Sequence, residues 1–130
     1  MHKATSPVIH DFFLRCTADG ILIVNERGLI ELINPAAAAM LVVRTDEIIG
    51  RDPMQIFSQN MALLNLISRS GDQMLEVRLP RRRLALGMAS TLEDGRRAIL
   101  LQDITEKAEL ESRREALIAT MAHDLRNPIS

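Results

Sequence analysis

Aromatic residues are nearly absent from this chain of 130 residues, which contains no Trp, no Tyr and only three Phe. Apolar residues nevertheless make up 47% of the sequence, which is enough to fill a core and argues against a disordered chain. The core must therefore be aliphatic, rich in Ile, Leu, Val and Met. A protein with so few aromatic rings is also poorly equipped to stack on a flavin or a haem.

Cysteine and long apolar runs are scarce as well. Cys16 is the only cysteine, so no internal disulfide can form and a reducing compartment is indicated. The longest apolar run, residues 35–43, falls far short of the roughly 20 residues of a membrane-spanning helix, and residues 1–7 lack the pattern of a secretory signal. We therefore expect a cytoplasmic protein, while a longer parent chain could still carry a membrane anchor.

Neither sign of charge is in excess. The 16 Lys and Arg residues nearly balance the 17 Asp and Glu residues, which gives a net charge of −1. Such a chain has no overall field that would attract nucleic acid or an acidic membrane, so no nucleic-acid partner is expected. The length allows one ordinary domain with a short extension.

Hydrophobic periodicity changes several times along the chain and predicts its elements. At residues 7–16 apolar side chains recur at helical spacing, which predicts an amphipathic helix with Ser6 as its N-cap. The other predicted elements are strands at residues 21–24 and 29–33, short helices beginning near Pro35 and Thr45, a helix within residues 58–70, and three strands within residues 74–105. This order predicts an α+β fold, a five-stranded antiparallel sheet with short flanking helices on one face.

Polar residues and prolines set the expected helix boundaries. Asn34 and Pro35 form a pair of N-cap and first helical residue. Thr45 is expected to cap the next turn, which Gly50 ends. Pro53 is expected to break the chain.

The last part of the chain has the pattern of a long helix that leaves the domain. Residues 103–106 read Asp-Ile-Thr-Glu, a capping box with Asp103 as N-cap. Residues 106–115 are almost entirely charged, so this stretch cannot pack deeply against the sheet. Two short series of apolar residues at heptad spacing predict a weak coiled coil: Leu110 and Leu117 in one seam, and Ile104, Ile118 and Leu125 in its neighbour.

Several short motifs between residues 7 and 105 resemble those of PAS domains. They are residues 19–25 (DGILIVN), 34–37 (NPAA), 48–51 (IIGR) and 103–105 (DIT). The resemblance implies a PAS-like sheet with flanking helices, the arrangement that the order of elements also predicts. It further implies a role as a sensor or a dimerisation module.

A second resemblance is shorter and more specific. Residues 121–130 (MAHDLRNPIS) resemble the H-box of sensor histidine kinases, in which a histidine accepts phosphate from ATP and passes it to an aspartate of a response regulator. The resemblance implies that His123 is the phosphoacceptor and that Asp124 is the acidic neighbour that orients or deprotonates it. It also implies that Asn127 takes part in dephosphorylation.

The residue types suit this chemistry on physical grounds. An unperturbed imidazole is substantially neutral yet nucleophilic near pH 7, and an adjacent carboxylate can hold one ring nitrogen protonated. At about 100° per residue, His123 points away from the apolar face that includes Ile118, so its side chain should be exposed. Asn127 follows one turn later on the same side. Pro128 should kink the helix.

Other interpretations of these residues remain open. A lone histidine on a polar helix face is most often simply solvated. His123 and Asp124 also match the metal-binding pair of an HD-type phosphohydrolase, but that site needs further ligands and the other histidines, His2 and His10, lie far upstream. No metal site is therefore predicted.

No cofactor is predicted within the chain. Haem would need an axial ligand, usually His, which the predicted helix within residues 58–70 and the strand after it lack. Cys16 is misplaced for the reactive cysteine of flavin-binding relatives of PAS domains. Met61 and Met74 are expected to fill the core, although methionines could also line an adaptable pocket for a small apolar ligand. Residues 81–83 (RRR) fit a solvated turn better than an anion site.

The sequence thus divides into an N-terminal amphipathic helix (residues 1–17), a PAS-like domain (18–105), and a signalling helix that runs into a truncated phosphoacceptor helix (106–130). The implied parent is a homodimeric histidine kinase that uses ATP and Mg²⁺, held by its own ATP-binding domain, and that acts on a cognate response regulator. The fragment alone is expected to be inactive. The alternative is a ligand-free dimerisation scaffold that sets the kinase geometry, with sensing done elsewhere.

Overall fold

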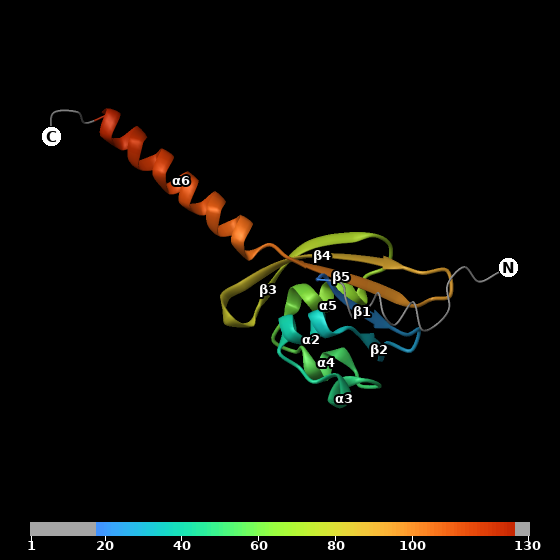
Figure 1. Cartoon of the computed structure of the whole chain (residues 1–130). Coiled ribbons are helices and arrows are strands. Elements are labelled where there is room, and N and C mark those ends of the chain that lie inside the picture. Colours follow the sequence, from blue (N-terminus) through green and yellow to red (C-terminus); the bar gives the residue numbers. More distant parts are fainter. Residues whose placement is uncertain (1–17, 127–130) are drawn as a thin grey trace.

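A computed structural model describes residues 18–126, so the helix predicted at residues 7–16 lies outside the described residues. Five antiparallel strands form one sheet in the order β2-β1-β5-β4-β3 (Figure 1). The strands are β1 (Gly20–Val24), β2 (Ile30–Ile33), β3 (Gln73–Leu79), β4 (Arg83–Thr91) and β5 (Arg97–Asp103). The predicted α+β fold with a five-stranded antiparallel sheet is confirmed.

Pairing between neighbours in the chain explains most of this order. β1 and β2 form a hairpin, and β3, β4 and β5 follow one another as antiparallel neighbours. The last strand then pairs with the first, with Leu22 of β1 opposite Ile99 of β5. β5 therefore lies at the centre of the sheet and joins the early part of the domain to the late part.

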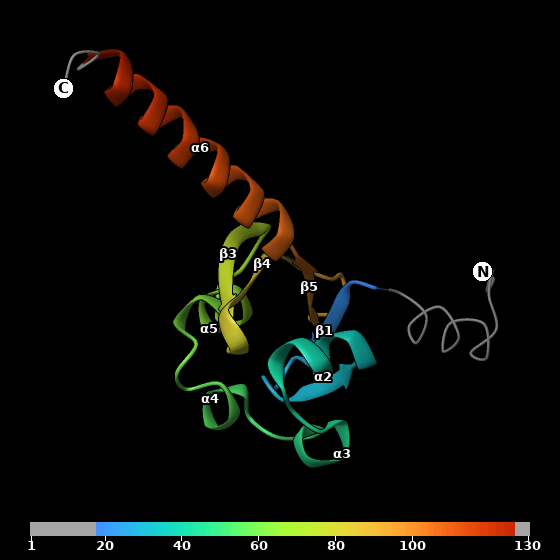
Figure 2. The same cartoon turned by 60° about the vertical axis from the view of Figure 1, so that its left-hand side comes forward.

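Four short helices connect β2 to β3 and lie on one side of the sheet (Figure 2). They are α2 (Pro35–Leu41), α3 (Thr45–Ile48), α4 (Pro53–Ile56) and α5 (Met61–Ser68). α2 packs on β1, and α5 packs on β3, β4 and β5. The prediction of flanking helices on one face is confirmed.

The first of these helices begins where the sequence indicates. Asn34 occupies the N-cap of α2, and its Oδ1 accepts a hydrogen bond from the Ala37 N–H at 3.0 Å. The expected cap at Thr45 is wrong. Thr45 is the first residue of α3, and Arg44 in the N-cap position makes no side-chain cap hydrogen bond.

Two further expected boundaries need correction. Pro53 does not break the chain but starts α4, because Asp52 caps this helix through the Met54 N–H at 2.9 Å and proline suits the first helical turn. The helix expected within residues 58–70 is shorter, and it begins after Asn60, whose Oδ1 accepts from the Leu63 N–H at 3.2 Å. Side-chain caps rather than apolar periodicity set both starts.

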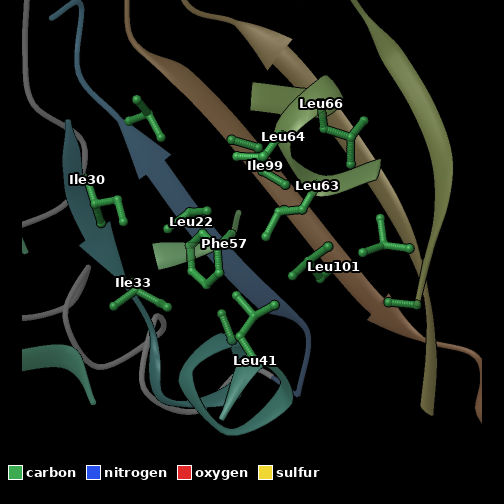
Figure 3. Packing of buried hydrophobic residues seen from close by; sticks show 14 of the residues in the cluster. Leu22, Ile30, Ile33, Leu41, Phe57, Leu63, Leu64, Leu66, Ile99 and Leu101 are labelled. Carbon is green, nitrogen blue, oxygen red and sulfur yellow. The ribbon is translucent and has the colours of Figure 1, made fainter. Parts of the chain in front are cut away.

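The core lies between these helices and the inner face of the sheet, and it is aliphatic as predicted (Figure 3). Phe57 is the aromatic member of the buried cluster. At Gly87 of β4 a Cβ atom would lie 2.5 Å from Leu66 Cδ1, so α5 approaches the strand as closely as a glycine permits. Met61 and Met74, expected in the core, are instead 65% and 62% exposed.

α6 (Thr105–Arg126) follows β5 almost directly and extends away from the sheet (Figure 1). Nearly all of its residues beyond Thr105 are exposed, which confirms that the charged stretch leaves the domain. The expected capping box is wrong in detail, because Asp103 is the last residue of β5 and its carboxylate accepts from the Thr105 N–H instead of the Glu106 N–H. Within residues 18–126, no helix is both long enough and apolar enough to cross a membrane.

Candidate functional site

A polar junction joins α6 to the sheet, and we define this α6 anchor as Arg83, Leu84, Asp103 and Thr105. The Thr105 hydroxyl accepts a hydrogen bond from the Leu84 N–H at 2.9 Å and donates one to the Asp103 carboxylate at 2.6 Å. Arg83 Nε donates to the other oxygen of Asp103 at 2.7 Å. Since Arg83 and Leu84 belong to β4 and Asp103 to β5, a shift between these strands would move the start of α6.

The α6 anchor is charged at neutral pH. Burial on its own would raise the pKa of the Asp103 carboxyl group, but hydrogen bonds from Arg83 and Thr105 outweigh it and hold the pKa below its usual range. The hydrogen bond to Asp103 in turn raises the pKa of the Arg83 guanidinium. Of the three arginines expected in a solvated turn, Arg81 and Arg82 are exposed there, whereas Arg83 is the first residue of β4.

Further along, α6 carries large apolar side chains that face solvent. They are between 55% and 80% exposed, and they comprise Leu110, Leu117, Ile118, Met121 and Leu125. The last four lie on one side of the helix at its 3.6-residue period, and we call them the α6 apolar face. An unburied apolar face of this kind is typical of helices that contact a second surface.

His123 lies near the end of the described helix, and its side chain is 73% exposed. Its neighbour Asp124 is 76% exposed, and His123 Nδ1 lies 3.8 Å from Asp124 Oδ1. The pair is therefore accessible to a second domain or protein. Asn127 lies outside the described residues, and the catalytic roles of all three residues stay predictions.

The sheet has a second, outer face that the helices α2–α5 do not cover. It carries an apolar hollow of about 650 Å³ whose lining includes Ile21, Met74, Met88 and Leu100. Met74 thus belongs to this outer surface, which explains its exposure. The hollow spans β1, β5, β4 and the start of β3.

A signal for this surface is present in the sequence of β1. There Ile21 and Ile23 alternate with the buried Leu22 and Val24, so the strand is apolar on both faces and needs cover on both. Among the described residues, helices cover a single face and leave the outer one uncovered. In the described part of the chain, no group of three His, Cys, Asp or Glu side chains could hold a metal ion.

The fold and this helical extension place the protein in a known class. Residues 18–106 match the family model of the PAS domain, and the chain belongs to this family. The matched residues comprise the whole sheet, the helices on its inner face and the first two residues of α6.

Among curated proteins, the chain is 27% identical over 120 residues to the sensor protein kinase WalK of Staphylococcus aureus. The alignment covers 87% of this chain and 29% of that protein, and 20% of the same kinase from the JH9 strain. The chain therefore spans less than a third of the length of these relatives. An alignment that covers 87% of the 130 residues must continue past residue 106, where the family match ends. The similarity therefore extends into α6.

Solved structures share the fold. The PAS domain of BvgS from Bordetella pertussis is 17% identical, with a TM-score of 0.63 over 88% of this chain and 93% of that chain. The PAS domain of nitrogen regulation protein NR(II) from Vibrio parahaemolyticus is also 17% identical, with a TM-score of 0.57 over 77% of this chain and 100% of that one. Together with the similarity to a sensor kinase, the PAS family supports the role of a sensory module.

Proposed function

We propose that this chain is the sensory and dimerisation module of a sensor histidine kinase, joined to the helix that carries the phosphoacceptor His123. The observation that carries the proposal is the continuation of β5 into α6, which puts an exposed His-Asp pair on a helix anchored to a PAS sheet. The similarity to a sensor protein kinase, which reaches into α6, supports it. So does the resemblance of residues 121–130 to the H-box.

The proposed chemistry is phosphoryl transfer to an imidazole nitrogen. That nitrogen attacks the γ-phosphorus of ATP, the bond to the bridging oxygen breaks and ADP leaves; the phosphoryl group then passes to an aspartate of a response regulator. Asp124, 3.8 Å from Nδ1, would favour a proton on that nitrogen and leave the other free to attack. Asn127 would take part in dephosphorylation.

The parent protein would supply the remaining parts of this reaction. ATP and Mg²⁺ would be held by its own ATP-binding domain, since phosphoryl transfer needs the metal to neutralise charge on the phosphates. The single Cys16 fits a cytoplasmic location for this chemistry. The chain alone would not be an active kinase.

A second copy of the chain is the partner that the α6 apolar face would contact. Leu117, Ile118, Met121 and Leu125 would pair with the same residues of a parallel α6, as in a two-stranded coiled coil. Residues 7–16 precede β1 in the chain. Their predicted apolar face would cover the outer sheet face in the dimer. A small apolar ligand is a further candidate occupant of the hollow on this face.

The α6 anchor would couple the sheet to the helix pair. A ligand or partner that alters the packing of β4 against β5 would move Leu84 and Asp103, and with them the first turn of α6. The charged residues 106–115 give this segment no dominant apolar register. A bias of a few kcal/mol would then suffice to shift the helix pair between two arrangements.

A ligand-free dimerisation scaffold is the second candidate function. The apolar hollow on the outer sheet face favours this scaffold, because an exposed apolar surface is typical of a protein contact. An absorption spectrum and a native mass of the purified chain separate the two candidates. A bound chromophore or metabolite supports sensing, whereas a dimer of bare polypeptide mass supports the scaffold.

The phosphoacceptor assignment is tested in the parent protein with labelled ATP. His123→Gln should abolish labelling, because the amide has no nucleophilic ring nitrogen. The control is Ser112→Ala, which changes an exposed residue on the same side of α6 as His123 and should label like the wild type. Label that survives in the His123 variant would contradict the assignment.

A further inference from the structure

Arg97, the first residue of β5, is a buried cation with neutral partners. Only 5% of its surface is exposed. Its Nε donates to the Leu66 carbonyl at 2.8 Å, and its Nη1 donates to the Gly71 carbonyl and to the Thr91 hydroxyl. None of these acceptors is a carboxylate, so none neutralises the charge.

The second terminal nitrogen of this guanidinium, Nη2, is buried without a hydrogen-bond partner in the described part of the chain. Burial lowers the pKa of the Arg97 guanidinium, and the charge of Asp72 opposes this shift from a distance. Arginine nevertheless stays protonated at neutral pH. A buried charge with an unsatisfied donor is costly, and proteins normally place an acceptor, and usually an anion, beside it.

Arg97 is one of the residues that line a hollow of about 410 Å³. This cavity is bounded by the β1–β2 turn, the start of α4, the end of α5 and the loop after it, and the facing ends of β4 and β5. Arg27 and Arg69 line it together with Arg97. The acidic residues in the wall are Glu26 and Asp52, and the Asp52 carboxylate already caps α4.

We propose that this cavity binds a small anion that carries a carboxylate or phosphoryl group, with Arg97 as the buried charge at its base and Arg27 and Arg69 at its rim. A guanidinium presents its N–H groups as a fork that matches both kinds of oxyanion. The hydroxyls of Ser68, Ser70 and Thr91 supply further donors in the lining. The site does not depend on the phosphoacceptor role of His123, since the binding is a property of the sheet domain.

A purely structural role for Arg97 is the competing explanation. Its bonds to Leu66 and Gly71 tie the end of α5 and the following loop to the sheet, and carbonyls near a helix C-terminus favour a cation. That role accounts for Nε and Nη1. It accounts neither for the unpartnered Nη2 nor for two more arginines around the same cavity.

The test is a titration of the whole chain with sodium phosphate and, separately, with sodium succinate, against sodium chloride at equal ionic strength. Binding is followed through the Nε–H signal of Arg97 in ¹⁵N–¹H spectra and through the melting temperature. We expect phosphate, succinate or both to shift the signal saturably and raise the melting temperature. A response to one salt alone identifies its oxyanion as the ligand class; a response that chloride reproduces, or none, overturns the proposal.

Variants at the rim keep the test independent of the folding role of Arg97. Arg27→Gln and Arg69→Gln change exposed residues, and each should weaken anion binding by about tenfold through the loss of one charge-assisted contact. Arg44→Gln is the matched control, because Arg44 is exposed and lines a different hollow beside α3. Equal affinity in all three variants and the wild type would place any bound anion elsewhere.

Discussion

Single polar side chains hold the junctions of this domain, and Asp103 is the one through which the sheet meets α6. Its two oxygens have different partners: one accepts from the N–H and hydroxyl of Thr105, and the other accepts from Arg83 Nε. The carboxylate therefore links a neighbouring strand to the first turn of a 22-residue helix. Its ionisation should be visible in the stability of the chain.

We expect Asp103→Asn to lower the free energy of unfolding by about 1 kcal/mol at pH 7, because the partly exposed pair with Arg83 loses its charge. The folded-state pKa of Asp103 is depressed, so its contribution is present above the unfolded value of about 3.9. That contribution is lost as the pH falls through the lower folded value. Urea denaturation followed by circular dichroism should show the two proteins converging in acid.

A matched control for this experiment is Asp46→Asn. Asp46 forms an exposed contact of 3.4 Å with Arg44, far from α6, and its loss should change the stability by less than about 0.5 kcal/mol. A difference between wild type and Asp103→Asn that does not shrink as the pH falls below the unfolded pKa of about 3.9 would show that the lost shape of the side chain, and not its charge, causes the effect.

At the scale of elements, Asn34 joins the start of α2 to the start of β1. Its Oδ1 accepts hydrogen bonds from the N–H groups of Ala37 and Ile21 at 3.0 and 2.8 Å, and its Nδ2 donates to the Asp19 carbonyl at 2.9 Å. The residue is 2% exposed, so water cannot replace these partners. Asn34 is thus both a helix cap and a buried cross-link.

We expect Asn34→Ala to lower the free energy of unfolding by about 2 to 4 kcal/mol. The lost cap contributes about 1 kcal/mol, and the buried groups left without partners contribute the remainder. Asn60→Ala is the control, because Asn60 also caps a helix but its side-chain bond to the Arg78 carbonyl is exposed. If both variants shift the urea midpoint equally, the buried bonds of Asn34 to Ile21 and Asp19 add no stability beyond its helix cap.

The sequence predicts the elements of this fold better than it predicts their ends and their surroundings. Strand and helix types follow from periodicity, and Asn34-Pro35 marks its helix correctly. Pro53 was expected to break the chain, whereas it starts α4, because Asp52 caps that helix through the Met54 N–H. The partner of Arg97 could not be predicted, since Leu66 and Thr91 approach it only after the sheet has formed.

The same limit applies to the candidate site. Helical geometry predicts an exposed His123, and its side chain is 73% exposed, but the opposite, apolar side of α6 is exposed as well, so the orientation stays a prediction. The α6 anchor does not follow from the sequence, because Leu84 and Thr105 lie 21 residues apart and meet only through the pairing of β4 with β5. The expected capping box failed for this reason: the Asp103 carboxylate serves the sheet as well as the helix.

At the scale of the whole molecule, two apolar surfaces are left uncovered by the rest of residues 18–126. One is the hollow on the outer sheet face, and the other is the α6 apolar face. Helices α2–α5 bury only the inner face of the sheet, and α6 turns away from the domain instead of folding back on it (Figure 2). Contact with a partner would bury such apolar surfaces and remove them from water.

If that partner is a second copy, a charge placed in the α6 apolar face should separate the two chains. We expect Ile118→Asp to raise the dissociation constant of the dimer by about two orders of magnitude, because two carboxylates would face each other in a desolvated seam. Ser112→Asp is the control, since Ser112 is exposed on the opposite side of the helix. Sedimentation equilibrium measures the outcome: a wild type that stays monomeric, or an Ile118→Asp variant that dimerises like the control, would rule out pairing through α6.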